Sequence, residues 1–214
     1  MKFALESIRF VLPPAVLGII AQAASVYSGQ AYLSVFAAVF AVIAVAILLF
    51  FRDPERIIPE GREKVLAPAD GRVLLSDTLP DGRKRVAIFM SVFNVHINRC
   101  PVSGSIQKVD KRPGKYFNAA TDKAEQMNAR VDVVAESEFG SVAWRQISGL
   151  IARKICCRLK PGDVVRAGDR FGLIYFGSRM EVFLPASAIL IAHPGEKVRS
   201  GETVIANLAL EAII

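Results

Sequence analysis

The sequence predicts a mainly β domain that follows a helical membrane anchor. Two long apolar runs lie near the N-terminus, and the rest consists of short β-branched or alternating segments separated by Gly, Pro and Asp. A near-repeat late in the chain is a third indication of a β architecture. Of the 214 residues, 52% are hydrophobic, which exceeds the usual content of a soluble domain of this size.

The first two apolar runs predict the anchor. Residues 31–51 carry no charge, and residues 10–25 are apolar apart from Gln22. A bilayer core about 30 Å thick takes roughly 20 helical residues, so the second run can cross it and the first is marginal, leaving one or two helices. A cleavable signal peptide is the alternative, but two successive runs without a clear small-residue cleavage pattern disfavour it.

Positive charges flank the anchor on both sides. The segment between the runs, residues 26–30, has none, whereas basic residues stand before the first run and after the second: Lys2, Arg9, Arg52, Arg56, Arg62 and Lys64. By the positive-inside rule, both flanks are cytoplasmic. The pattern predicts a helical hairpin with the remaining domain in the cytoplasm.

The chain after the anchor divides into a linker and one domain. Residues 1–51 are the anchor, residues 52–62 with two prolines and a glycine are the linker, and residues 63–214 are long enough to bury one core. The predicted strands of this domain include residues 72–75, 85–91, 131–135, 141–147 and 152–159.

Residues 161–174 and 194–206 form the near-repeat. Both begin with Pro-Gly, carry a second glycine at the same position and place Val or Ile between acidic residues. Each glycine permits a tight turn between short strands. The unit resembles the hammerhead of lipoyl-like and biotinyl-like barrel-sandwich hybrid domains, a likeness that concerns fold and not function.

Cysteine content and charge narrow the classes of function. The three cysteines, Cys100, Cys156 and Cys157, are odd in number and lack C-x-x-C spacing, so neither a disulfide framework nor a metal site is indicated. The net charge of +7 fits attraction to an anionic membrane surface. No motif for binding nucleic acid accompanies it.

Three short segments carry the candidate chemistry. Gly177-Ser178 lies between the repeat copies, Asp70-Gly71 stands early in the domain, and His96 lies in an apolar stretch. Taken singly, the glycine pairs are ordinary turns and the histidine is an ordinary core residue. His193, the other histidine, precedes Pro194 and is interpreted as structural.

Taken together, these segments resemble the phosphatidylserine decarboxylase family in its short membrane-anchored form. The likeness covers residues 52–214 and is carried by Pro-Ala-Asp-Gly at 68–71, Val-His-Ile-Asn-Arg-Cys-Pro at 95–101, Gly-Lys-Tyr-Phe-Asn-Ala-Ala at 114–120 and Phe-Gly-Ser-Arg at 176–179. Larger members carry Leu-Gly-Ser-Thr at the last motif and a second histidine where this chain has Arg99.

The resemblance implies an autocatalytic proenzyme. The chain would be cut between Gly177 and Ser178 into a β chain, residues 1–177, and an α chain, residues 178–214, which stay together as a heterodimer. Ser178 would become a covalent pyruvoyl group that decarboxylates phosphatidylserine in the bilayer to phosphatidylethanolamine and carbon dioxide through a Schiff base. Localisation at the cytoplasmic face of the plasma membrane and self-association are implied as well.

The resemblance also makes Ser178, His96 and Asp70 the catalytic residues. A serine hydroxyl needs a base to become nucleophilic, and His96 can be that base while Asp70 holds its tautomer, as in a Ser-His-Asp triad. His96 is also the natural acid for protonating the carbanion left by decarboxylation. How Asp70 and His96 divide self-cleavage and decarboxylation stays open.

Two other classes of protein share parts of this pattern. A biotinyl-like carrier needs a lysine at the hairpin tip between its half-motifs, and residues 178–182 contain none. A periplasmic adaptor would have helical heptads and the opposite orientation. A conventional serine hydrolase would show G-x-S-x-G around Ser178, which is absent.

The charge flanks predict which side of the membrane holds the domain. Protease added outside intact cells should leave residues 63–214 undigested, whereas lysed cells should lose them. Mass spectrometry of the surviving peptides measures this. Digestion in intact cells would reverse the orientation.

Overall fold

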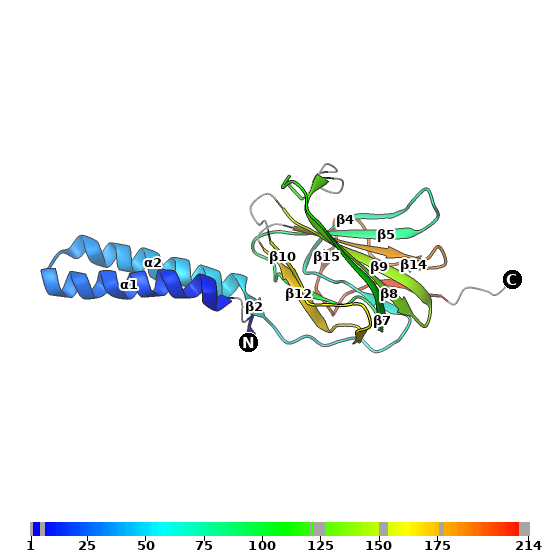
Figure 1. Cartoon of the computed structure of the whole chain (residues 1–214), viewed down its shortest axis with the longest axis horizontal. Helices are drawn as coiled ribbons and strands as arrows, with labels where there is room; N and C mark the ends of the chain where they lie inside the picture. The colour runs from blue at the N-terminus through cyan, green and yellow to red at the C-terminus, as the bar shows by residue number, and fades with distance from the viewer. Residues whose placement is uncertain are drawn as a thin grey trace. The chain divides into compact units, whose positions relative to one another are not determined.

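The computed structural model describes residues 2–4, 7–119, 121, 127–149, 154–175 and 178–209. These form two compact units, Met1–Glu55 and Arg56–Ile214. The first contains two apolar helices, and the second is built of strands (Figure 1). The prediction of a mainly β chain with an N-terminal pair of apolar helices is confirmed.

The N-terminal unit is a helical hairpin. Helices α1 (Ile8–Ser28) and α2 (Ala31–Phe50) are long and apolar enough to cross a membrane. Gly29 turns the chain between them with a φ of 71°, and its N–H donates to the Ser25 carbonyl. The short strands β1 (Lys2–Phe3), which precedes α1, and β2 (Arg52–Asp53), which follows α2, pair antiparallel.

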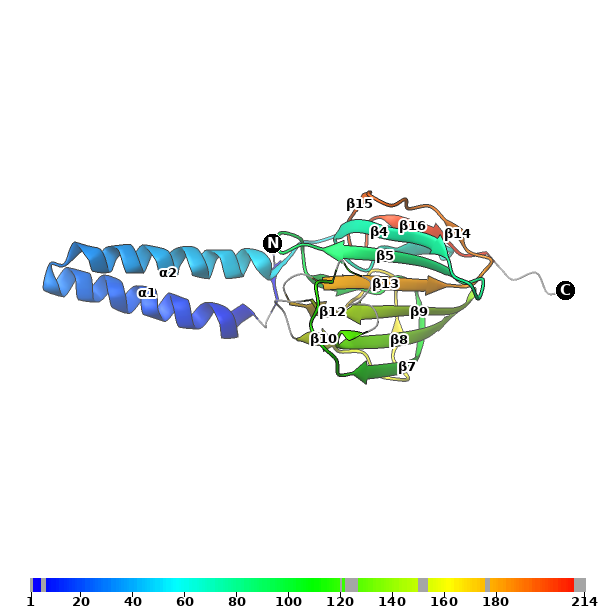
Figure 2. The ribbon, with the colours of Figure 1, turned by 90° about the horizontal axis from the view of Figure 1, so that it is seen from above.

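Three antiparallel sheets make up the second unit. The largest has eight strands in the order β11-β7-β8-β9-β13-β5-β4-β15, and its middle strands lie side by side in Figure 2. Two three-stranded sheets, β10-β12-β6 and β14-β16-β3, complete it. The strands are β3 (Lys64–Leu66), β4 (Gly71–Thr78), β5 (Lys84–Met90), β6 (Ile97–Arg99), β7 (Gly104–Arg112), β8 (Arg130–Ser137), β9 (Gly140–Ile147), β10 (Ile155–Cys157), β11 (Val164–Val165), β12 (Arg170–Ile174), β13 (Ser178–Leu184), β14 (Ile189–Leu190), β15 (Lys197–Val198) and β16 (Val204–Asn207).

The alternation of apolar residues explains where the core lies. In β9, Val142 and Trp144 are fully buried and belong to the core, while Arg145, the next residue, makes ion pairs on the opposite face. Trp144 packs against Phe171 of β12 with ring centroids 5.8 Å apart. The core therefore fills the space between the eight-stranded sheet and the smaller sheets.

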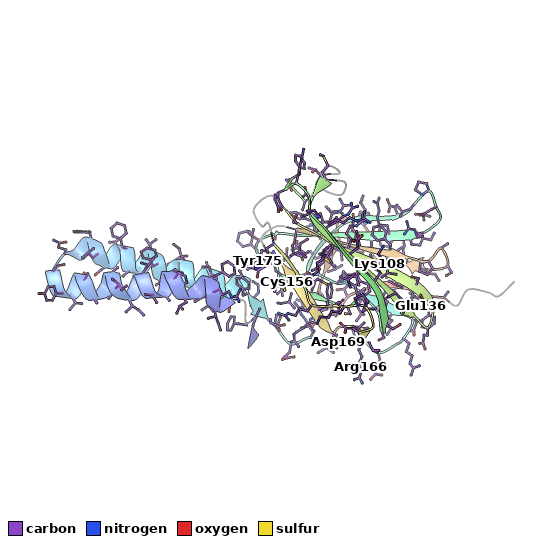
Figure 3. All side chains as sticks on the ribbon, in the orientation of Figure 1. Lys108, Glu136, Cys156, Arg166, Asp169 and Tyr175 are labelled. Atoms are coloured by element: carbon purple, nitrogen blue, oxygen red, sulfur yellow. The ribbon has the colours of Figure 1, made fainter. Side chains whose placement is uncertain are left out.

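Both copies of the near-repeat adopt the same local structure. Gly162 and Gly195 have φ angles of 93° and 91°, and a two-residue strand, a second positive-φ glycine and a longer strand follow in each copy. The backbone of Arg166 accepts from and donates to Asp169 in the first copy (Figure 3). Strands β11 and β15 from the two copies form opposite edges of the eight-stranded sheet.

The repetition extends to an earlier pair of segments that the sequence analysis did not detect. The Leu66 N–H donates to the Pro101 carbonyl at 2.8 Å, and the Arg99 N–H donates to the Pro68 carbonyl at 3.0 Å. These bonds are reciprocal, since each joins equivalent positions of the two segments. The domain is therefore built from two similar halves whose first segments, around Pro68 and Pro101, are hydrogen-bonded to each other.

The cysteines behave as core thiols. Cys100 is buried, Cys156 and Cys157 are partly buried, and all three are reduced. Burial raises the pKa of the Cys100 thiol above its usual value, and that of Cys157 in the same direction. Because the thiolate is the reactive form, these cysteines are suited to packing and not to catalysis.

Candidate active site

Ser178 is the first residue of β13, the strand that lies between β9 and β5 in the largest sheet. It shares the inner face of that strand with Met180 and Val182 and is 0% exposed. Among the residues that the structure describes, its hydroxyl oxygen has no hydrogen-bond partner. Gly177, the other residue of the predicted cleavage site, lies outside the described residues.

His96 is buried in the connection between β5 and β6. Its Nδ1 lies 2.9 Å from the backbone oxygen of Asn94. Because a carbonyl can only accept, Nδ1 carries the hydrogen and Nε2 of the neutral ring is left as the basic nitrogen. A tight turn fixes this carbonyl, since the Asn94 side chain accepts from both the N–H and the hydroxyl of Ser91.

The strand register brings His96 and Ser178 to the same edge of the domain. Ser178 pairs with Met90 at the end of β5, and the chain runs from Met90 through the turn to His96. On the other side, Leu173 of β12 pairs with Ile97 of β6. Both the connection from β5 to β6 and the connection from β12 to β13 thus join the eight-stranded sheet to the same three-stranded sheet. His96 is the last residue of the first connection, and Ser178 directly follows the second.

Asp70 lies at this end of the sheet too, immediately before β4. Arg56 holds both oxygens of its carboxylate at 2.9 Å, and the Ser200 N–H donates to it at 2.8 Å. A hydrogen bond between Asp70 and His96 is not among the contacts of the described residues. The group that orients the imidazole through Nδ1 is therefore the Asn94 carbonyl and not the Asp70 carboxylate, which is drawn to the buried guanidinium of Arg56.

The internal repeat separates two roles of Asp70. At the equivalent position of the other half, the Ser103 hydroxyl accepts from the Ala167 N–H at 2.9 Å, as Asp70 accepts from Ser200. A serine is thus sufficient to cap this turn. The negative charge of Asp70 and its pairing with Arg56 are additions that the turn itself does not require.

A cleft of about 610 Å³ connects Asp70 with the turn that holds His96. Gly71 allows β4 to approach β5 here, because a Cβ at this position would stand 2.1 Å from the Phe89 carbonyl oxygen. The cleft is lined by Asp70, Gly71, Arg72, Phe89, Ser91, Asn94, Lys197, Val198 and Arg199. Its three basic side chains make it suited to an anionic group.

Two buried amides next to Ser178 were not identified from the sequence. Asn98 and Gln146 are both 0% exposed, and the Gln146 Nε2 donates to the Asn98 Oδ1 at 2.9 Å. Gln146 follows Val142 and Trp144 on the inward-facing positions of β9. A polar residue at the end of such an inward-facing series is the signal that could have found it.

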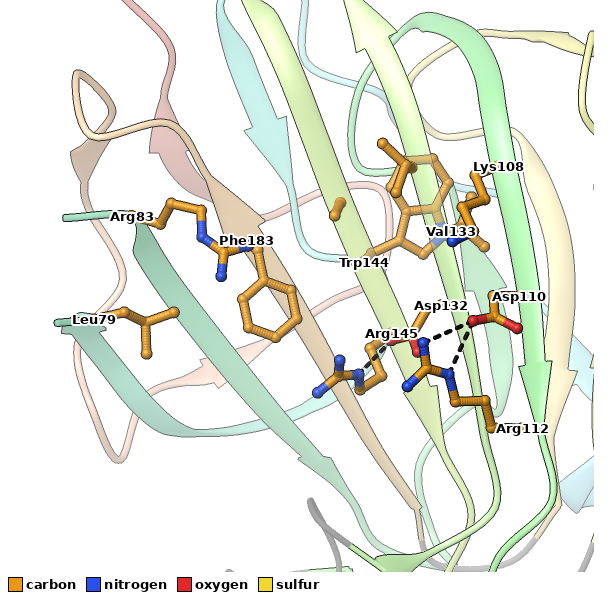
Figure 4. A pocket seen from close by; sticks show the side chains of 12 residues that line it. Leu79, Arg83, Lys108, Asp110, Arg112, Asp132, Val133, Trp144, Arg145 and Phe183 are labelled. Carbon is orange, nitrogen blue, oxygen red and sulfur yellow. Dashed lines mark hydrogen bonds and ion pairs between the residues drawn. The ribbon is translucent and has the colours of Figure 1, made fainter. Parts of the chain in front are cut away.

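A second depression lies on the opposite face of the large sheet (Figure 4). It measures about 370 Å³, and none of Ser178, His96 and Asp70 lines it. Four of its charged side chains pair with one another, Arg145 with Asp132 and Arg112 with Asp110. In the part of the chain that the structure describes, no three His, Cys, Asp or Glu side chains form a group that could hold a metal ion.

Comparison with known proteins gives one consistent family. The model of the phosphatidylserine decarboxylase family matches residues 43–206. A phosphatidylserine decarboxylase proenzyme of Nitratidesulfovibrio vulgaris is 44% identical over 183 residues, covering 83% of this chain and 84% of the relative. Proenzymes of the same name from Paramagnetospirillum magneticum, 46% identical over 74% of this chain and 70% of the relative, and Anaplasma phagocytophilum, 42% identical over 81% and 80%, match similarly.

The Arg56–Asp70 pair yields a prediction about stability. The two side chains are 7% and 13% exposed, and removing one partner of a buried pair leaves the other charge uncompensated. Arg56→Met should lower the free energy of unfolding by about 3 kcal/mol, and adding Asp70→Ser should recover most of that loss. Urea unfolding in detergent, followed by the fluorescence of Trp144, measures both.

An exposed pair provides the control. Arg83 and Asp81 are each about half exposed, so Arg83→Met should leave the unfolding curve unchanged. If Arg56→Met unfolds at the same urea concentration as Arg83→Met, the Arg56–Asp70 pair does not stabilise the domain.

Proposed function

Because the chain belongs to the phosphatidylserine decarboxylase family, we propose that it converts phosphatidylserine to phosphatidylethanolamine and carbon dioxide after cutting itself before Ser178. The observation that carries the proposal is the serine itself. Its hydroxyl is fully buried and lacks a partner among the described residues, and the buried base His96 is fixed at the same edge of the domain. The relatives' description as proenzymes supports processing.

Self-cleavage needs an attacking oxygen and a base. The Ser178 hydroxyl adds to the carbonyl carbon of Gly177, the peptide C–N bond breaks, and an ester replaces it. His96 takes the hydroxyl proton at Nε2, since Nδ1 is committed to the Asn94 carbonyl. Elimination of the Gly177 carboxylate and hydrolysis with loss of ammonia leave a pyruvoyl group at the start of the α chain.

The environment of Ser178 fits a pyruvoyl group. The residue lies on the inner face of a central strand, is shielded from water and shares that face with Met180 and Val182, so a carbonyl there is protected from side reactions. When present, the group supplies a ketone that condenses with the substrate amine and accepts electrons as carbon dioxide leaves. His96 then returns a proton to the carbon that lost its carboxylate.

Asp70 acts through its charge and not through direct contact with His96. Its carboxylate lines the cleft that also contains Ser91 and Asn94, and the imidazole depends on both of these residues for its orientation. A negative charge near an imidazole stabilises its protonated form electrostatically. The paired Arg56 holds the carboxylate in place.

The basic cleft suits the phosphodiester of the substrate. Arg72, Lys197 and Arg199 line it, and its wall is formed by residues on either side of Met90, the register partner of Ser178. A phosphate bound there would leave the serine head group to reach inward. The apolar helices α1 and α2 would keep the domain at the cytoplasmic face of the plasma membrane, where the acyl chains stay in the bilayer.

The two cleaved chains would remain interlocked. Strand β13 of the α chain pairs with β5 and β9 of the β chain, and β15 and β16 pair with β4 and β3. The cut therefore removes one peptide bond while the sheets remain paired. This supports a heterodimer of residues 1–177 and 178–214.

We further propose that the domain is a barrel-sandwich hybrid of the hammerhead type. Two copies of the same turn-strand-turn-strand unit at opposite edges of the large sheet support it. A carrier of that fold would hold its modified residue at an exposed tip between the copies. Here the same stretch contains the buried strand β13, which favours the decarboxylase over the carrier.

The cleavage is tested by the intact mass of the purified protein. The wild type should give two fragments, residues 1–177 and a blocked piece of residues 178–214, and Ser178→Ala should give one uncut chain. Ser141→Ala, on an exposed position of β9, is the matched control and should be cut like the wild type. An uncut wild type in a folded preparation would return the carrier or adaptor to consideration.

The role of His96 is tested with the two histidines of the chain. His96→Ala should slow self-cleavage, and the fraction that matures should decarboxylate phosphatidylserine at least about 100-fold more slowly, since a general acid contributes that much. His193→Ala, on an exposed turn, should behave as wild type. Normal cleavage and normal turnover by His96→Ala would remove His96 from the mechanism.

A further inference from the structure

The buried amides Asn98 and Gln146 form a polar group beside Ser178. Gln146 lies opposite Met180, which is two residues along β13 from Ser178 on the same face. Asn98 accepts from the Gln146 Nε2 at 2.9 Å, and its own Nδ2 lies 3.7 Å from the sulfur of Met90. Since Met90 is the register partner of Ser178, the amide pair extends from β9 to β5 across the inner face at the start of β13.

One atom of this group is unsatisfied. The Gln146 Oε1 is buried and has no hydrogen-bond partner among the residues that the structure describes. A buried acceptor without a donor is destabilising, and its presence in a native protein calls for an explanation. An unsatisfied acceptor on the same face of the sheet as Ser178 is explained if a donor arrives there during function.

We propose that the Gln146 Oε1 accepts a hydrogen bond from the primary amine of the substrate and presents that amine at position 178. The inference rests on the proposed function and adds a specificity determinant to it. Of the three polar groups in a phosphoserine head, the carboxylate and the phosphate carry only acceptors at neutral pH, so the amine alone can donate. The oxygen therefore selects the amine end of the head group for the reacting position.

Asn98 is the positioning residue for this contact. Its Oδ1 binds the Gln146 Nε2–H, which fixes the amide plane and leaves Oε1 as a buried acceptor without a partner among the described residues. The neutral amide also avoids a buried charge next to the reacting group, which would be costly without a partner. His96 precedes Asn98 by two residues on the same segment, so one short stretch carries both the proton-transfer group and the residue that positions Gln146.

Two substitutions at one position separate an acceptor role from a packing role. Gln146→Met keeps the length of the side chain and removes the oxygen, whereas Gln146→Glu keeps an acceptor oxygen. Gln107→Met, on an exposed position of β7, is the matched control. All three proteins and the wild type are first checked for cleavage by intact mass, which reports folding and processing independently of turnover.

Amine binding is then measured with the soluble head group sn-glycero-3-phosphoserine. Cyanoborohydride reduces the captured amine to a stable adduct on the 178–214 fragment, and the adduct is quantified by mass. Gln146→Met should be cut and should capture the amine at least about tenfold more slowly at subsaturating head group, because a hydrogen bond to a charged amine contributes that much. Gln146→Glu keeps an acceptor oxygen but loses the hydrogen bond to Asn98, so it should capture the amine faster than Gln146→Met. Gln107→Met should capture it at a rate close to that of wild type.

The outcomes separate this inference from the proposed function. Capture by cut Gln146→Met at the wild-type rate, or equal slowing in the Met and Glu variants, overturns the amine contact. If only Gln146→Met stays uncut, the Glu variant decides, with capture within about tenfold of the wild-type rate supporting the contact and slower capture overturning it. If both stay uncut while wild type is cut, Gln146 acts in self-cleavage and the inference is overturned. An uncut wild type that captures no amine defeats the proposed function itself.

Discussion

The pairing of β13 with β5 on one side and β9 on the other is the constraint on which the site depends. It buries Ser178 at the start of a strand whose backbone is bonded along both edges. A serine in an exposed loop would be solvated and mobile, whereas this one has a fixed position and no competing partner among the described residues. The two connections between the same pair of sheets then determine which other residues can reach it.

Charged and neutral polar groups are separated within the site. The ionised groups, Asp70 and Arg56, neutralise each other beside the cleft, where water and a phosphate can reach. Next to Ser178 the polar side chains are amides and an imidazole held by a backbone carbonyl. This arrangement keeps uncompensated charge out of the dry interior, where it would be most destabilising. The reacting groups are instead oriented by hydrogen bonds, which are directional.

The sequence was sufficient for the elements that depend on local pattern. The apolar runs, the strands β4, β5, β8 and β9 and the turns of the late repeat follow from periodicity and glycine positions. The triad geometry could not be predicted in the same way, because the partner of Asp70 is Arg56, a residue from the predicted linker, and a backbone carbonyl leaves no signature in the sequence. Gln146 was not identified from the sequence because its role depends on the strand register, which places it on the same face of the sheet as Ser178.

The two halves of the domain share a turn that is capped by Asp70 in one and by Ser103 in the other. A duplicated framework gives each half the same backbone with an independent choice of side chain, so one copy can carry a reactive charge while the other preserves only the turn. A change of side chain at one of the two equivalent positions then leaves the turn of the other half unchanged. The backbone of the turn can therefore be kept while the charge beside the cleft is changed, because a hydroxyl caps the same turn in the other half.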